Sequence, residues 1–491
     1  MYMGNVLSNL KPAALWKNFE DICGIPHPSK HEEKIREHVL NWAKEHNLAV
    51  IVDEVGNVIV SKPATPGMEN RKGIILQAHL DMVPQKNSDT QHDFLTDPIL
   101  PRIVDGWVHA TGTTLGADNG IGMAAAMAVM EATDLVHGPL EMLLTVDEET
   151  GMTGAFGLKA GLLKGEILLN LDTEEEGDLC VGCAGGTNAN MTFTFTNEPV
   201  TDDVEAFKIS VKGLKGGHSG VDIHLERANS NKLLNRILWH AYYNLGLRLS
   251  GIDGGSLRNA IPRESFAVVT LPKTNVEKFK KFVKELTQIV INEYKNVETD
   301  ITILVEPSEK PASWIDNKTT ANLLNAIYAT PNGVIRDSQD MKGLVETSTN
   351  LAIVKSENNE VKIQCLLRSS VDSAKDDLEK MFAAVYNLAG AAYVFEGKYP
   401  GWKPNMDSPI LKEMLLAYEK QFGNKPHISA IHAGLECGLL GGVYKNWDMI
   451  SFGPTINYPH SPDEKVNIPS VEKFWAFLTE TLKNAPKKDV A

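Results

Sequence analysis

The stretch GIILQAHLDMV, residues 73–83, is an almost wholly apolar run that ends in two polar groups, His79 and Asp81. Such runs are typical of strands at the centre of a parallel sheet, which are buried on both faces. Three further stretches have the same form: LEMLLTVDEET (140–150), ILLNLDTE (167–174) and MISFGPTINYPHSPDEKV (449–466). Because open α/β sheets bind ligands beyond the carboxyl ends of their strands, the pattern predicts an α/β domain with its site at that edge.

The length and charge of the chain limit the classes of protein to which it can belong. With 491 residues it is too long for one ordinary hydrophobic core, so two or three domains are expected. Hydrophobic residues at 43% and charged residues at 23% are typical of a globular protein. The basic and acidic residues give a net charge of 48 − 63 = −15, which argues against nucleic acid or an anionic membrane as a partner.

The cysteines and the N-terminal segment indicate the compartment. Five cysteines are few and odd in number, which fits a reducing compartment better than a disulfide framework. Residues 1–23 lack a basic segment followed by an unbroken apolar run, so no signal peptide is expected. No stretch approaches the length of a transmembrane span. The sequence therefore predicts a soluble, cytoplasmic protein.

The first 190 residues alternate between helix and strand patterns. Residues 29–32, SKHE, have the form of a capping box, and apolar residues then recur at helical spacing. Residues 48–52 and 58–60 flank a Gly-Asn pair, which indicates a hairpin. Residues 120–132 are apolar nearly all round and predict a buried helix on the sheet.

The pattern changes after the pair Gly185-Gly186. Residues 191–198 and 206–213 alternate between polar and apolar, as half-buried antiparallel strands do. Further patterns of helices and alternating strands follow, and the α/β pattern returns near Trp402. We therefore expect a discontinuous α/β domain and an α+β insertion that folds as a lid, with the boundaries 1–188, 189–400 and 401–491.

The polar groups at the strand ends are of types that bind divalent metals. His79 and Asp81 are two residues apart and share a face of the strand, so Asp81 can bind one ring nitrogen and leave the other for a metal. Asp118 precedes the buried helix, where a carboxylate can bridge two metals. The alternative role for Asp118 is that of a helix cap.

The acidic run after residue 146 predicts the catalytic base. Like charges as close as Asp147, Glu148 and Glu149 repel one another unless cations or protons neutralise them. In a two-metal hydrolase one such carboxylate binds metal and its neighbour deprotonates the attacking water. We therefore assign Glu149 as a ligand and Glu148 as the general base; a solvated acidic turn is the alternative.

Asp172 and His460 complete the candidate metal ligands. Each alone is explained by an ordinary turn or surface residue, but five candidates of suitable type fall at strand ends or turns of one α/β pattern. A set of histidines and carboxylates without a thiolate points to zinc, manganese or cobalt in an open, catalytic site.

Several motifs, taken together, closely resemble those of the di-zinc metallopeptidases that include carnosinases. They are QAHLDMV (77–83), LGADNGIGMA (115–124), TVDEETGMTGA (145–155), LLNLDTE (168–174), GGHSG (216–220), RNAIPRE (258–264) and SFGPTINYPHSPDEKV (451–466). The resemblance runs over nearly the whole chain. It implies a phosphorylase/hydrolase-like α/β zinc peptidase domain with an inserted α+β lid. It also implies hydrolysis of unblocked dipeptides, including Xaa-His types such as carnosine.

The resemblance implies a role for each matching residue of the α/β domain. Asp81 would orient a histidine ligand, and Glu148 would be the base. Two zinc ions would be held by two sets of ligands that share one aspartate: His79, Asp118 and Asp172, and Asp118, Glu149 and His460.

In the lid, the resemblance implies groups that bind the substrate. His218 would stabilise the oxyanion of the tetrahedral intermediate, while Asn259 and Arg368 would anchor the substrate. Arg368 would take the terminal carboxylate, which suits the bidentate guanidinium. Gly434 lies at the position of a substrate-contacting glycine loop, although this loop differs from the Gly-Gly-Thr pattern common in the superfamily. A homodimer formed through the lid is also implied.

Three other functions stay open at this point. An N-acyl amino acid amidohydrolase of the same superfamily would have similar motifs, and sequence alone does not separate a dipeptidase from a tripeptidase. A non-enzymatic binding protein on the same scaffold is the third alternative. The presence of Glu148 and His218 argues against it, because binding alone requires neither a general base nor an oxyanion donor.

Overall fold

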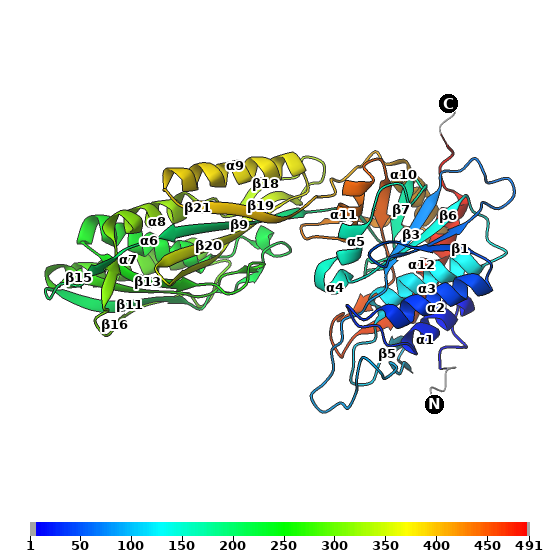
Figure 1. The fold of residues 1–491 in the computed structure, drawn as a ribbon, viewed down its shortest axis with the longest axis horizontal. Coiled ribbons are helices and arrows are strands. Elements are labelled where there is room, and N and C mark those ends of the chain that lie inside the picture. Colours follow the sequence, from blue (N-terminus) through cyan, green and yellow to red (C-terminus); the bar gives the residue numbers. More distant parts are fainter. Residues whose placement is uncertain (1–5, 489–491) are drawn as a thin grey trace. The chain divides into compact units, whose positions relative to one another are not determined.

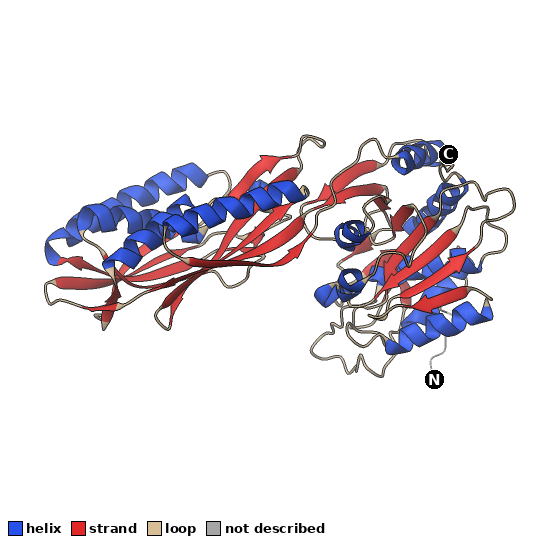
Figure 2. Ribbon diagram, turned by 45° about the horizontal axis from the view of Figure 1, so that its top comes forward, coloured by secondary structure: helices blue, strands red, loops and turns tan. Residues whose placement is uncertain are grey.

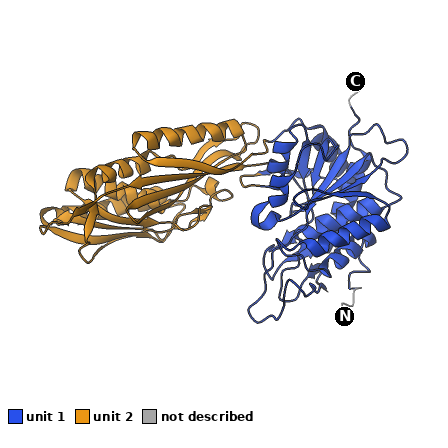
Figure 3. Ribbon diagram, in the orientation of Figure 1, with its two compact units in different colours: residues 1–182, 404–430, 435–491 blue, residues 183–403, 431–434 orange. Residues whose placement is uncertain are grey.

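The computed structural model describes residues 6–488. The chain divides into two compact units, which Figure 3 distinguishes by colour. Unit 1 is formed by Met1–Gly182, Pro404–Ala430 and Leu435–Ala491, and unit 2 by Cys183–Lys403 and Ile431–Gly434.

These bounds differ by a few residues from those expected at 188 and 400. The first boundary falls earlier because the chain enters unit 2 at Cys183, where strand β8 (Asp178–Cys183) ends, before the alternation of polar and apolar residues becomes visible. The short return of Ile431–Gly434 to unit 2 was not expected, because four residues carry no pattern of their own.

Unit 1 is built on a mixed sheet whose central strands are parallel (Figure 1). Strand β3 pairs in parallel with β6 and β7, and β7 pairs in parallel with β23. These strands are buried, as the apolar runs predicted. The order across the sheet is β1 (Ala49–Val52), β2 (Val58–Lys62), β6 (Leu140–Thr145), β3 (Ile74–His79), β7 (Ile167–Asn170), β23 (Asp448–Ser451), β8 and β22 (His427–Ile431).

The predicted hairpin and the predicted buried helix of unit 1 are both confirmed. Strands β1 and β2 pair antiparallel on either side of the Gly-Asn turn. Helix α3 (Ala117–Glu131) is buried over nearly its whole length and packs on β3 and β6. The remaining helices are α1 (Ala13–Cys23), α2 (Glu33–Glu45), α4 (Glu148–Gly151), α5 (Thr153–Gly157), α10 (Pro409–Phe422), α11 (Glu436–Val443) and α12 (Ile468–Lys483).

A smaller sheet of unit 1 carries the last part of the chain. Its order is β24 (Ile456–Asn457), β25 (Lys465–Asn467), β5 (Trp107–His109) and β4 (Arg102–Val104). The loop between β24 and β25 contains His460 and is thereby held beside the segment that leads into α3.

Unit 2 is an antiparallel sheet covered by helices on one face (Figure 2). Its strands run in the order β16 (Thr302–Pro307), β11 (Val204–Lys212), β15 (Ser265–Pro272), β13 (Arg248–Gly254), β19 (Val345–Glu357), β20 (Glu360–Ser369), β9 (Gly185–Thr194) and β21 (Ala392–Tyr399), with β18 (Gly333–Asp337) beside β19. The helices that pack on it are α6 (Ser230–Leu245), α7 (Val276–Tyr294), α8 (Asn317–Ala329) and α9 (Asp372–Leu388).

Short pairs and turns complete unit 2. Strands β12 (Gly217–His218) and β14 (Ala260–Ile261) form one pair, and β10 (Asn197–Pro199) and β17 (Ser313–Ile315) form another. Two short 3₁₀ turns span Ile223–Leu225 and Lys273–Asn275. Phe207, Phe279 and Phe382 are among the buried side chains that join the sheet to its helices. The α+β character expected of the insertion is therefore confirmed.

The predicted capping box at residues 29–32 is wrong. The residue before helix α2 is Glu32, and its side chain caps nothing in that helix. Ser29 instead donates a hydrogen bond to Asp81, and Glu32 accepts one from the backbone of Asp147. The local pattern is the same for both roles, but the true partners lie far along the chain. Among the helices of residues 6–488, none combines the length and apolar character needed to cross a bilayer.

Candidate active site

The candidate site of unit 1 lies at the carboxyl ends of its parallel strands. Strand β3 ends at His79, and β6 and β7 end just before the segments that carry Glu149 and Asp172. Because these strands run in the same direction, their ends meet at one edge of the sheet. The loop between β24 and β25 adds His460.

The five predicted ligands form two groups that share Asp118. Ligand atoms of His79, Asp118 and Asp172 lie within 4.8 Å of one another, and so do those of Asp118, Glu149 and His460. Nε2 of His79 is 3.1 Å from Oδ1 of Asp118, and Nε2 of His460 is 3.1 Å from Oδ2. The two oxygens of one carboxylate therefore face two different histidines. Asp118 has an extended backbone, with φ −86° and ψ 107°, at the start of α3. Among the described residues, its carboxylate pairs with the two histidines and not with a backbone amide of the helix.

The third ligand of each group also lies close to the histidine of that group. Nε2 of His79 is 3.5 Å from Oδ1 of Asp172, and Nε2 of His460 is 3.0 Å from Oε2 of Glu149. The other carboxylate oxygen of Glu149 is buried and has no hydrogen-bond partner among the described residues. A buried carboxylate oxygen without a partner is costly unless a cation neutralises it. Mixed imidazole and carboxylate donors around a shared aspartate thus fit a pair of divalent cations.

The ionisable groups of this site strongly perturb one another. Burial, aided by neighbouring carboxylates, raises the pKa of Glu148 to about 8. Burial is also the largest cause that raises the pKa of Asp172 to about 8. The hydrogen bond to Asp118 is the main reason that the pKa of His460 rises to about 11. Perturbed values of this kind cluster at functional sites.

Asp81 is a hub that positions three neighbouring groups. Its carbonyl oxygen lies 2.9 Å from Nδ1 of His79 and its Oδ1 lies 3.4 Å from the same atom, which leaves Nε2 facing the ligand groups. The carboxylate also accepts hydrogen bonds from the backbone amides of Glu148 and Glu149, at 3.0 and 3.2 Å. Asp81 therefore fixes both His79 and the acidic turn; only the first of these contacts was expected from the sequence.

Glu436 is a buried acid near the site that the sequence analysis missed. Its Oε2 accepts hydrogen bonds of 2.7 Å from Gln77 and from Thr145, while Oε1 has no partner among the described residues. Burial and the nearby charge of Glu148 raise the pKa of Glu436 to about 8. Gln77 lies two residues before His79 on the same strand, so Glu436 belongs to the polar layer directly beneath the ligands.

The predicted lid residues His218 and Asn259 are held together in unit 2. The pairing of β12 with β14 places His218 opposite Ala260, and the amide of Ser219 donates to the carbonyl of Asn259 at 2.7 Å. Nδ1 of His218 accepts hydrogen bonds from the amides of Gly220 and Val221. Since Nδ1 acts as an acceptor, the neutral ring carries its proton on Nε2, which is left as a donor.

Arg368 and Gly434 both lie against Tyr399, a residue that was not predicted from the sequence. Nη1 of Arg368 donates to the Tyr399 hydroxyl at 3.2 Å. A Cβ atom on residue 434 would lie 3.2 Å from the Tyr399 ring, so only glycine packs there without displacing the ring. The buried ammonium group of Lys375 donates to the Tyr399 carbonyl, which fixes its backbone. These contacts link residues that are far apart in sequence, so no local sequence pattern predicts them.

His432 connects the same group to the central strands of unit 2. Its Nε2 lies 2.7 Å from the hydroxyl of Ser348, which pairs with Arg368 across β19 and β20. Burial, with the nearby charge of Arg368, lowers the pKa of His432 to about 3. The same two causes, in the same order, lower the pKa of His218. Both histidines are therefore neutral at ordinary pH.

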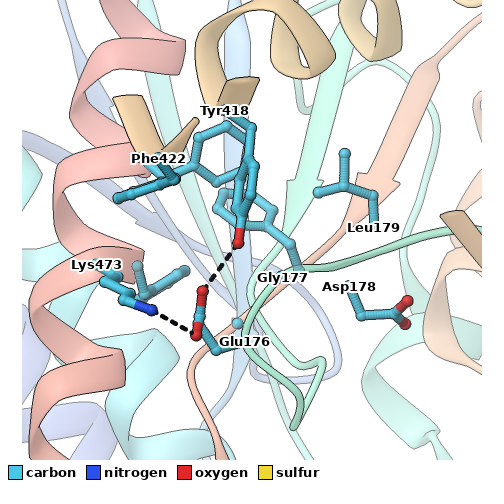
Figure 4. Close-up of a pocket in the computed structure, with 11 residues that line it drawn as sticks. Glu176, Gly177, Asp178, Leu179, Tyr418, Phe422 and Lys473 are labelled. Carbon is cyan, nitrogen blue, oxygen red and sulfur yellow. Dashed lines mark hydrogen bonds and ion pairs between the residues drawn. The ribbon is translucent and has the colours of Figure 1, made fainter. Parts of the chain in front are cut away.

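A small pocket of unit 1 is lined by none of the predicted site residues (Figure 4). Glu176 accepts hydrogen bonds from the hydroxyl of Tyr418 at 2.9 Å and from Lys473 at 3.1 Å. The cavity volume is only about 10 Å³, room for no more than a single water. This pocket is too small to bind a peptide.

The chain matches a known protein family and a characterised relative. The model described as "Peptidase family M20/M25/M40" matches residues 75–484. The cytosol non-specific dipeptidase of Escherichia coli strain K12 is 49% identical over 482 residues, which cover 98% of this chain and 99% of that protein.

Solved structures give the same result. The aminoacylhistidine dipeptidase of Vibrio alginolyticus matches with a TM-score of 0.96 at 50% identity and covers 99% of both chains. The aminopeptidase PepT of Bacillus cereus, at 15% identity and a TM-score of 0.56 over 97% of this chain and 99% of that one, shares the fold. The chain belongs to peptidase family M20/M25/M40.

Proposed function

We propose that this chain is a metal-dependent dipeptidase that hydrolyses the peptide bond of unblocked dipeptides, including Xaa-His types such as carnosine. The observation that carries the proposal is the pair of ligand groups that share Asp118, with the acid Glu148 beside them. The names of the Escherichia coli and Vibrio alginolyticus relatives support the dipeptide specificity. The first name also supports a cytoplasmic location.

Two cations would be held by the side chains already described. His79, Asp118 and Asp172 would bind one, and Asp118, Glu149 and His460 the other. Zinc is the ion that this donor set fits best, with manganese and cobalt as alternatives. When bound, two such cations lower the pKa of a shared water and polarise the peptide carbonyl.

Glu148 would move the proton. Its carboxylate would accept the proton of the attacking water and later donate it to the leaving amine nitrogen. Its backbone amide donates to the carboxylate of Asp81, which holds the main chain of the turn that carries the base. Because desolvation favours the protonated acid, Glu148 can hold the proton between the two steps.

The substrate would be read by unit 2. Arg368, oriented by Tyr399, would bind the terminal carboxylate, and Asn259 would hold the peptide backbone. The N–H of His218 at Nε2 would donate to the oxyanion of the tetrahedral intermediate. Gly434 would let the substrate approach the backbone of its loop and, at the same time, leave room for the Tyr399 ring.

We also propose that the chain forms a homodimer through unit 2. Strand β21 lies at one end of the sheet order and is mostly exposed, with Val394 53% and Tyr393 37% exposed. An exposed edge strand with apolar side chains can pair with a second copy. Light scattering of the wild type and of Val394→Lys tests this: a dimer in the first and a monomer in the second is expected. A wild-type monomer would contradict it.

The function is tested by a panel of substrates after chelation. Free dipeptides, β-alanyl-histidine, tripeptides and acetylated or succinylated amino acids are assayed with zinc, manganese or cobalt restored. Cleavage of dipeptides that depends on added metal is expected. Cleavage of acylated amino acids without cleavage of dipeptides would instead identify an amidohydrolase, and a preference for tripeptides would identify a tripeptidase.

A further inference from the structure

One buried carboxylate binds four successive backbone amides at the start of helix α3. Oε2 of Glu464 accepts from the amides of Leu115 and Gly116, at 2.7 and 3.0 Å. Oε1 accepts from the amides of Ala117 and Asp118, at 2.7 and 3.2 Å. Glu464 is only 2% exposed. An ionised carboxylate has acceptors alone, so four converging N–H donors match it fully.

The backbone at this point is shaped to receive an anion. Gly116 has φ 71°, in the left-handed region that favours glycine, and this turns successive amides toward one point. Helix α3 has no hydrogen bond from a side chain of its own cap residue. Glu464, 346 residues further along the chain, therefore satisfies the amides that the start of the helix leaves open.

The same carboxylate joins the two loops that carry the second group of ligands. Asp118 donates its own amide to Glu464, and His460 lies four residues before Glu464 on the loop that enters β25. Nε2 of His460 and Oδ2 of Asp118 are 3.1 Å apart. Glu464 thus fixes the spacing of two segments that are remote in sequence and supply facing ligand atoms.

We infer that Glu464 is a positioning residue for the cation held by Asp118, Glu149 and His460, an inference that rests on the two-metal function proposed above. By holding the loop of Asp118 and the loop of His460 in one arrangement, it prepares that group before the cation binds. The group of His79, Asp118 and Asp172 depends on it less, because His79 is the last residue of strand β3 and Asp172 follows the end of strand β7 by two residues.

The variant Glu464→Gln tests this with little change in shape. Each oxygen of Glu464 accepts two amides, so whichever way the glutamine amide is turned, two backbone donors face its NH₂ group. Residues that orient metal ligands typically change metal affinity by about 10–100-fold when they are replaced. Stepwise titration of metal-free protein with Co²⁺, followed by visible absorption, should show the first ion bound as in the wild type. The second ion should bind about 10–100-fold more weakly.

Glu298→Gln is the matched control. Glu298 is also buried, and its two oxygens accept from the backbone amides of Lys215 and Ala228, but it lies in unit 2 and contacts no proposed ligand. It should bind both Co²⁺ ions as the wild type does. Raised Co²⁺ concentration should restore the turnover of Glu464→Gln, which a general loss of structure would not allow.

Three outcomes would overturn the inference. One is a folded Glu464→Gln that binds its second Co²⁺ as tightly as the wild type, and another is an equal loss in Glu298→Gln. If Glu464→Gln does not fold, Glu464→Asp keeps the charge but is too short for all four amides, and a folded Glu464→Asp with wild-type affinity for both ions is the third. A wild type that binds fewer than two Co²⁺ ions would instead defeat the two-metal function itself.

Discussion

Unit 1 and unit 2 place the side chains of the proposed site in opposite electrostatic surroundings. In unit 1, carboxylates gather around two histidines, and burial raises the pKa of Glu148 and of Asp172 to about 8. In unit 2, histidines gather near one arginine, and burial lowers the pKa of His218 and of His432. The first arrangement suits cations and a proton carrier; the second suits a substrate anion.

The difference follows from the architecture of the two sheets. Parallel strands bring several chain ends to one edge, so short-range sequence patterns suffice to build a site there. The antiparallel sheet of unit 2 presents residues from adjacent strands, such as Ser348 and Arg368, and completes them with loops from elsewhere. We therefore expect variants of unit 1 to change chemistry and metal content, and variants of unit 2 to change the response to the substrate.

The largest effect expected from unit 2 is that of His218→Ala. Loss of one donor to an oxyanion typically lowers kcat about 10²–10³-fold. Metal content should stay unchanged, because His218 belongs to unit 2. The control is His224→Ala, on the same loop but exposed. Equal loss in both variants would remove the special role of His218.

Arg368→Ala should act on binding. A lost hydrogen bond to a charged group costs about 1.5–3 kcal/mol, so KM for dipeptides should rise at least tenfold, with a smaller effect on kcat. The wild type should discriminate against dipeptides amidated at the C-terminus, and the variant should lose that discrimination. Arg236→Ala, whose side chain forms an exposed ion pair with Glu293, is the control. Undiminished discrimination in Arg368→Ala would contradict the role in carboxylate binding.

The stability of the metal-free protein should fall as the pH rises. The folded-state pKa values of Glu148 and Asp172 are raised to about 8, so the folded chain binds protons more tightly than the unfolded chain. The stability that these two acids contribute is fully present below the usual carboxyl pKa and is lost as the pH rises through about 8. Each net proton contributes about 1.4 kcal/mol per pH unit.

Added cations should reverse this dependence, because the ligands bind metal only when deprotonated. Urea unfolding of chelated and metal-loaded protein between about pH 5 and pH 8 measures both slopes. A chelated protein that gains stability as the pH rises would contradict the assignment.

Tyr399→Phe should have the smallest effect. The variant removes the hydroxyl that accepts from Arg368 but keeps the ring against Gly434. One such hydrogen bond contributes about 0.5–1.5 kcal/mol, which corresponds to a rise in KM of roughly twofold to twelvefold. An unchanged KM, measured with the same dipeptide, would show that Arg368 is oriented by other contacts.

The sequence predicted the elements of unit 1 and the residues at its strand ends because each depends on a local pattern. His79, Glu149 and Asp172 follow apolar runs, and such runs are visible without knowledge of the fold. Tyr399, Glu436 and Glu464 could not be predicted in this way, because their partners lie far along the chain.

The capping box shows that a local pattern can also predict a contact that the folded chain does not make. Residues 29–32 have the required pattern, yet Ser29 and Glu32 bind Asp81 and the backbone of Asp147 in the folded chain. The return of Ile431–Gly434 to unit 2 is likewise a property of the tertiary structure. Local sequence therefore specifies the acids that could bind metal, while the contacts that position them appear only in the fold.

The separation of proton transfer from metal binding within the acidic turn is tested most directly by comparing Glu148→Ala with Glu149→Ala. Turnover of a dipeptide and bound metal, measured by elemental analysis of the same samples, are the two readouts. We expect the kcat of Glu148→Ala to fall by about 10²–10⁴-fold, while its metal content stays near that of the wild type. Glu149→Ala should lose metal. Loss of both metals from Glu148→Ala would contradict the assignment of Glu148 as the base.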